Sequence, residues 1–205
     1  MSEYFTNRTA LRAMGMIAVF ILFQGCLGRS PGVRHFILGT SASASTVARL
    51  PHTAVLIGPV QLPAYLDRSQ IATLEGGGEV FLDEFNRWLG GFEDNFLRAL
   101  SLGLARELGS ARVVVDPSKA PFAIDYQIRL HVDDLILEDG DGLRIRVRWA
   151  LVPLREEASP ELFLMDELVS VSGNSIEDVV RAHEDALADL ARRIANELKA
   201  RDAEG

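Results

Sequence analysis

The chain has 205 residues and a formal net charge of −8, and 48% of its residues are hydrophobic. A chain of this length buries roughly 70% of its unfolded surface, enough for one domain with a real core. Because acidic residues outnumber basic ones and the basic residues are not clustered, the composition argues against a nucleic-acid partner.

The N-terminal segment has the pattern of a secretory signal. Arg8 and Arg12 precede an apolar or small run over 13–23, which is shorter than the roughly 20 residues that a membrane-spanning helix needs. Gly25 and Cys26 follow, and Cys26 is the only cysteine in the chain. A lone cysteine in an exported protein is either a free thiol or an attachment point. Its position directly after the apolar run favours attachment.

The stretch LFQGC at 22–26 resembles a bacterial lipobox, although Phe23 stands where leucine is usual and Gln24 where a small residue is usual. The resemblance implies cleavage between Gly25 and Cys26 and an S-diacylglycerol and N-acyl lipid on Cys26, with no other cofactor. The alternative is an uncleaved apolar anchor that happens to contain a cysteine.

This resemblance divides the chain into a signal peptide over 1–25, a lipidated tether over 26–34, a domain over 35–200 and a disordered tail over 201–205. Leu27, rather than an aspartate, follows the cysteine. By resemblance to enteric sorting, this implies the periplasmic face of the outer membrane.

The first half of the domain predicts strands at 35–38 and 54–59 and a hairpin of 70–74 with 79–82 around Gly76, Gly77 and Gly78. A long helix is then predicted from Asp83 to Leu108, with a bend or break at Gly90 and Gly91. Its apolar stripe is Phe85, Trp88, Leu89, Phe92, Phe96, Ala99, Leu100, Gly103, Leu104 and Leu108, at spacings of three and four.

The second half predicts strands at 111–115, 124–133, 143–151 and 162–171, the middle two as a hairpin in which apolar and polar residues alternate. Arg146 and Arg148 should lie across from 133–135 and pair with the acids there. A second helix should begin at Ser175, with His183 on its apolar stripe. The predicted fold class is α+β, a single domain with a mostly antiparallel sheet and two long amphipathic helices on one face.

The residues give no sign of an enzyme. The four histidines are scattered without metal-site spacing, phosphate-binding and nucleotide-binding fingerprints are absent, and no nucleophile stands out. We therefore expect a non-enzymatic protein without a metal site.

The stretch LPAYLDRSQIATL at 62–74 is the most distinctive segment. Tyr65 and Leu66 present large groups beside the acid and base Asp67 and Arg68. The segment is either a turn stabilised by its own hydrogen bonds, with the tyrosine packed on the sheet, or an interface with another chain.

The stretch IGPVQLPAYLDRSQIATL, followed by FNRWL at 85–89, resembles the ABC-type transport auxiliary lipoprotein family, whose best-known branch is PqiC. The likeness covers nearly the whole mature chain. Ser69 departs from the family's usual proline, and Gly90 and Gly91 stand where the helix expected after the tryptophan normally continues.

The resemblance implies a docking or ring-forming adaptor in the Gram-negative envelope. Its expected partners are an MCE-domain periplasmic protein and an ABC permease and ATPase that transport lipid, together with further copies in a homo-oligomeric ring. The matching positions Tyr65, Leu66, Asp67, Arg68, Arg87 and Trp88 are then candidates for subunit packing or MCE-protein contact. The alternative is a periplasmic lipid carrier with an apolar cavity between sheet and helices.

Overall fold

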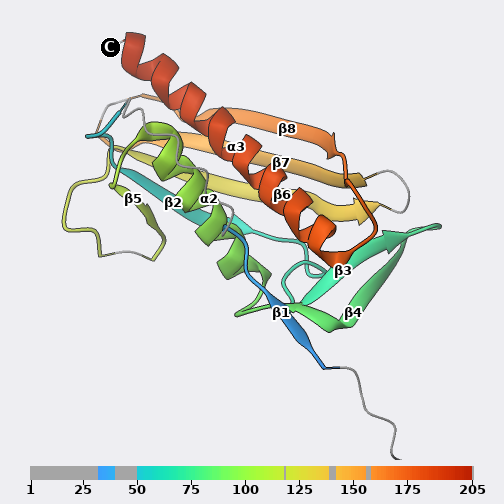
Figure 1. Ribbon diagram of the computed structural model, residues 1–205. Coiled ribbons are helices and arrows are strands. Elements are labelled where there is room, and N and C mark those ends of the chain that lie inside the picture. Colours follow the sequence, from blue (N-terminus) through green and yellow to red (C-terminus); the bar gives the residue numbers. More distant parts are fainter. Residues whose placement is uncertain (1–31, 40–49, 118, 139–141, 156–157, 205) are drawn as a thin grey trace, which may run out of the picture. The chain divides into compact units, whose positions relative to one another are not determined.

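The computed structural model describes residues 32–39, 50–117, 119–138, 142–155 and 158–204 (Figure 1). The predicted signal peptide, Gly25, Cys26 and most of the tether lie outside these residues. Residues 33–205 form a compact unit with its own hydrophobic core, and such a unit is expected to fold by itself.

The described chain contains eight strands and two helices. In order they are β1 (Arg34–Phe36), β2 (Val55–Gln61), β3 (Gln70–Glu75), β4 (Glu79–Trp88), α2 (Phe92–Leu108), β5 (Val113–Val115), β6 (Tyr126–Glu138), β7 (Gly142–Pro153), β8 (Glu161–Val169) and α3 (Ile176–Glu204).

The strands form one mixed sheet organised around β6. One edge of β6 pairs along its length with β7, which in turn pairs with β8. The other edge is shared by β2 near Tyr126 and β3 near Leu137, and both of these pairings are parallel. The antiparallel ladders β3–β4, β6–β7 and β7–β8 are the long ones, while the parallel ladders, including β1–β4 and β2–β5, are short. The α+β fold class is confirmed.

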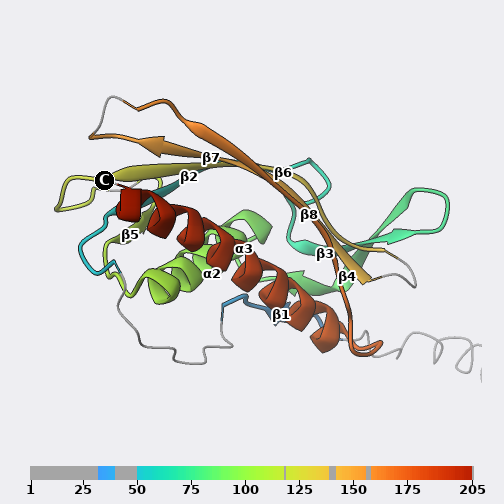
Figure 2. The ribbon, with the colours of Figure 1, turned by 90° about the horizontal axis from the view of Figure 1, so that it is seen from above.

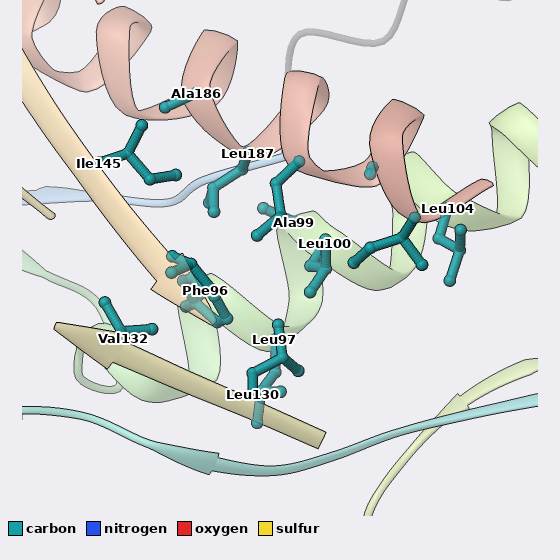
Figure 3. Close-up of a cluster of buried hydrophobic side chains, with 14 of the residues drawn as sticks. Phe96, Leu97, Ala99, Leu100, Leu104, Leu130, Val132, Ile145, Ala186 and Leu187 are labelled. Atoms are coloured by element: carbon teal, nitrogen blue, oxygen red, sulfur yellow. The ribbon is translucent and has the colours of Figure 1, made fainter. Parts of the chain in front are cut away.

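Both helices lie on the same face of the sheet and against each other (Figures 1 and 2). Between helices and sheet, the side chains of Phe96, Leu100 and Leu104 meet those of Val132 and Ile145, all of them buried (Figure 3). Burial of such side chains contributes roughly 1.5–3 kcal/mol each, so this layer supplies most of the stability.

The predicted β6–β7 hairpin is confirmed, and its alternation explains which face meets the helices. Leu130, Val132, Val147 and Trp149 are buried, whereas Arg148 points away from the helices. The centre of the predicted turn, 139–141, lies outside the described residues.

The prediction of a helix from Asp83 is wrong, because this segment belongs to β4. The Asp83 carboxylate accepts hydrogen bonds from the backbone N–H of Phe85 and of Asn86, at 2.8 and 3.0 Å, as a helix N-cap would. The chain then returns to the sheet, where Arg87 pairs with Gln70 and residues 84–86 form a bulge.

The helix α2 begins only after two glycines with positive φ. Gly90 has a φ of 82° and Gly91 a φ of 103°, values that no other residue type adopts readily. The predicted break is therefore complete, and Trp88 lies on a strand beside Phe36 of β1 instead of on a helix.

The C-terminal helix is longer than predicted. Ser175 and Asp178 form a reciprocal capping box, in which each side chain accepts a hydrogen bond from the other residue's backbone N–H at 3.2 Å. The helix continues through Glu204, so the predicted disordered tail is wrong for 201–204. Arg201 contributes an ion pair with Glu161 of β8, which fixes the last turn against the sheet.

Candidate functional site: the motif turn and the outer sheet face

The segment from Leu62 to Ser69, called the motif turn below, connects β2 to β3. Its backbone closes on itself: the N–H groups of Leu66 and Asp67 donate to the carbonyl of Pro63 at 2.9 and 3.2 Å. The Arg68 N–H donates to the Leu66 carbonyl at 2.7 Å. The turn thus satisfies its own backbone groups, as expected for a tight local structure.

Two further hydrogen bonds join the motif turn to the junction between β4 and α2. Trp88 N–H donates to the carbonyl of Ser69 at 2.6 Å, and Phe92 N–H donates to the carbonyl of Arg68 at 3.2 Å. Because the N-cap residue Gly91 has no side chain, the Arg68 carbonyl supplies an acceptor for the first amide of α2. Three sequence segments are therefore held in one place.

Three residues of the family motif anchor this region in the core. Leu66 and Trp88 are almost fully buried, and the Trp88 ring lies 5.6 Å from the ring of Phe92 and 5.2 Å from that of His183. The Tyr65 hydroxyl donates to the Asp134 carboxylate at 3.1 Å. Burial, followed by the negative charge of Asp134, raises the pKa of the Tyr65 phenol, so it remains a neutral donor.

The other motif residues face solvent. Asp67 and Arg68 are exposed, and the Arg68 Nε donates only to the carbonyl of Ala64, at 3.3 Å. Within the part of the chain that the structure describes, neither side chain makes an ion pair. Arg87 by contrast pairs with Glu84 three residues earlier, at 2.5 Å. Asp67 and Arg68 therefore lie on the surface and are available to another chain, while Arg87 is partly buried and already paired.

Exposed apolar side chains come from the same part of β4 and its end. Phe85 in the bulge is 46% exposed, and Leu89, directly after Trp88, is 53% exposed. Both were predicted to lie on the apolar stripe of a helix, because Phe85, Trp88 and Leu89 have the three- and four-residue spacing of one helix face. The Trp88–Ser69 hydrogen bond brings the end of β4, which carries Leu89, next to the motif turn, which carries the exposed Asp67 and Arg68.

The outer face of β6, β7 and β8 carries a ladder of ion pairs. Arg148 makes two hydrogen bonds to Asp133, at 2.9 and 2.6 Å, and these bonds lower the pKa of the Asp133 carboxyl. Arg146 lies 3.4 Å from Asp134, so the predicted cross-strand pairing of both arginines is confirmed. Asp166 of β8, whose role was not predicted from the sequence, binds Arg146 from the other side at 2.9 Å.

This ladder gives no chemical function by itself. Exposed pairs of this kind contribute about 0–1 kcal/mol each. Among the described residues, histidines and carboxylates form no group of three that could hold a metal ion.

The profile of the family described as "ABC-type transport auxiliary lipoprotein component" matches residues 36–195. The chain belongs to this family. The resemblance seen in the YLDR and RW motifs is therefore confirmed, and the family is one of transport auxiliary components and not a known enzyme family. Among curated proteins, none matches the chain in sequence.

Solved structures with TM-scores above 0.5 share the fold of this auxiliary lipoprotein. An uncharacterised protein has a TM-score of 0.65 at 14% identity, over 82% of this chain and 99% of its own. A Xanthomonas campestris protein of the family DUF330 has a TM-score of 0.59 at 14% identity, and the match covers 86% of this chain and 99% of that protein's chain. A PelC dodecamer from Paraburkholderia phytofirmans has a TM-score of 0.38 at 15% identity, over 74% and 93%. At these identities the first two comparisons show the fold alone.

Membership in a lipoprotein family indicates a membrane-associated envelope protein. Neither described helix combines the length and the apolar character that crossing a membrane requires.

Proposed function

We propose that this auxiliary lipoprotein is a non-enzymatic, docking or ring-forming adaptor, anchored through lipid on Cys26 at the periplasmic face of the outer membrane. Its partners are an MCE-domain periplasmic protein and the ABC permease and ATPase of the same system, which transports lipid or another hydrophobic compound. Family membership supports the auxiliary role, and the lipobox-like stretch before Cys26 supports the anchor.

The observation that carries the adaptor role is the division of the family motif into buried and exposed residues. Tyr65, Leu66 and Trp88 fix the motif turn to β6 and to the core. This rigid base presents Asp67 and Arg68 at the surface, and the Trp88–Ser69 backbone hydrogen bond brings the motif turn next to the end of β4, where Leu89 is exposed. Arginine next to apolar groups on a preorganised surface is the usual composition of an interaction hot spot, since little entropy is lost when such a surface is covered.

The carrier alternative has no comparable support. It requires an apolar cavity between the sheet and the helices, and that space is filled by packed side chains such as Phe96, Leu100 and Ile145 (Figure 3).

The adaptor role is tested first by the mass of residues 29–205 in solution, which lack the anchor and include the compact unit. We expect light scattering and native mass spectrometry to show a closed oligomer for the wild type and a folded monomer for Arg68→Ala. The matched control is Arg192→Ala, an exposed arginine on α3 that should leave the oligomer unchanged. A monomeric wild type would refute the ring, and an intact Arg68→Ala oligomer would remove the motif turn from the subunit contact.

The anchor is tested on the full chain in a Gram-negative host. Labelled palmitate should be incorporated into the wild type and not into Cys26→Ala. Equal labelling of the two would place the lipid elsewhere.

A further inference from the structure

A hollow of about 760 Å³ lies over the outer face of the sheet, where β2, β6, β7 and β8 come together. Strand register places Arg129, Ala150 and Leu162 in one row across it, and His131, Arg148 and Leu164 in the next. On β6 and β7 these residues alternate with buried ones, and on β8 they alternate with Phe163 and Met165, so they point away from the helices. The small side chain of Ala150 in the middle of its row helps to leave the space open.

One side of the hollow is apolar. Leu162 is 82% exposed and Leu164 is 60% exposed, both on the edge strand β8. Adjacent leucines exposed to this degree beside a concavity commonly mark a binding surface.

The opposite side of the hollow is cationic. The Nε of Arg129 donates to the Gln127 side chain at 3.0 Å, and among the described residues Arg129 has no carboxylate partner. This distinguishes it from Arg144, Arg146 and Arg148 on β7, each of which is ion-paired. In a protein with 29 acidic and 21 basic residues, an arginine left unpaired at such a place favours an anion.

We propose that this hollow binds an anionic amphiphile, with its carboxylate or phosphate group on Arg129 and a single hydrocarbon chain passing over Ala150 to Leu162 and Leu164. Neighbouring strands lie about 4.8 Å apart, so Arg129 and Leu162 are separated by roughly 10 Å, which a medium-length chain spans. The volume falls in the range of about 300–1,000 Å³ typical of small-molecule sites. The inference does not depend on the proposed adaptor role.

An extended peptide fits these observations less well. A peptide strand would pair with the open edge of β8, because that edge offers backbone N–H and C=O groups. It would not reach Arg129, which lies two strands further in.

The site is tested by isothermal titration calorimetry on residues 29–205. The probes are decanoate and decyl phosphate, both below their micelle concentrations, and uncharged decanol. We expect saturable binding of one or both anions, with decanol at least tenfold weaker. Arg129→Gln should weaken anion binding roughly tenfold or more, since it removes a charged hydrogen bond. Ala150→Leu should abolish it by filling the hollow, while the control Arg192→Gln should bind as the wild type does.

Each possible result either supports or overturns the proposed site. A preference between decanoate and decyl phosphate identifies the headgroup and supports the site, and binding by a monomer supports it even where ring formation fails. The proposal is overturned if neither anion saturates the wild type, or if decanol binds as tightly as the anions. Unchanged affinity in Arg129→Gln also overturns it. A change of oligomeric mass in Ala150→Leu with unaltered probe binding would instead assign the hollow to a contact between copies. A thermal unfolding midpoint close to that of the wild type verifies that each variant is folded.

Discussion

Burial of His183 should make the stability of the domain sensitive to acid. The side chain is 2% exposed and packs edge-on against the rings of Trp88 and Phe92. Its Nδ1 donates to the Val179 carbonyl at 2.8 Å, yet burial dominates and lowers the pKa of His183 to about 4. An unfolded histidine has a pKa near 6.5. Between these values the unfolded chain binds a proton that the folded chain does not, so stability falls as the pH falls through this window.

The size of the effect follows from the two pKa values. Relative to pH 7.5, the loss amounts to about 2 kcal/mol at pH 5 and about 3 kcal/mol at pH 4. The carboxyl groups of Asp133, Asp166, Glu177 and Asp178 also have lowered pKa values, because hydrogen bonds favour their ionised forms. Their contribution is present above their ordinary pKa and disappears only below it, near pH 4. A comparison of pH 7.5 with pH 5 therefore stays above the range in which these carboxyl groups lose their contribution.

The assay is urea unfolding of residues 29–205 followed by tryptophan fluorescence at both pH values. His183→Leu removes the titrating group, and its difference in unfolding free energy between pH 7.5 and pH 5 should be about 2 kcal/mol smaller than that of the wild type. His52→Gln, a substitution of an exposed histidine, should keep the wild-type difference. If His183→Leu retains the full pH dependence, the assignment of the acid sensitivity to His183 is refuted.

Two further predictions concern the motif turn and the contact between the helices. Tyr65→Phe should lower the free energy of unfolding by about 1 kcal/mol through loss of the hydrogen bond to Asp134, and an unchanged urea midpoint would contradict this. A Cβ at Gly103 would lie 2.9 Å from the Cβ of Ala191. Gly103→Ala should therefore lower the free energy of unfolding by about 1–3 kcal/mol through overpacking. The higher helix propensity of alanine offsets about 1 kcal/mol of this loss. Adding Ala191→Gly should recover part of the loss in a double-mutant cycle, whereas additive effects would exclude the close contact.

The sequence predicted best where local pattern and local structure coincide. The alternation along β6 and β7 is decided by neighbours on the same hairpin, and the start of the second helix at Ser175 depends on groups within one helical turn. Both needed only contacts between residues close in sequence, so both were predicted correctly.

The β4 segment shows why the same reasoning failed elsewhere. Asp83 binds the amides two and three residues later in a helix cap and in this bulge alike, so the local signal is the same. What decides for a strand is the pairing of Arg87 with Gln70 and of Trp88 with Phe36, more than 15 and 50 residues away along the chain. Tertiary pairing thus overrides the apolar spacing.

The candidate sites were predictable to different degrees. The motif positions were found from the sequence, but burial alone separates Trp88 in the core from Arg68 at the surface. The hollow could not be predicted, because its rows combine Arg129, Ala150 and Leu162 from three strands.

The central position of β6 has a consequence for the order of assembly. β2 and β3 both need β6 as a partner, and Val55 pairs with Tyr126, while Thr73 pairs with Leu137. A chain delivered from its N-terminus therefore presents these two strands long before their partner exists. Closing such long loops slows folding into the range of milliseconds to seconds, and strand edges left waiting invite association with other chains. The first half of the domain is therefore prone to aggregation until β6 is available to pair with β2 and β3.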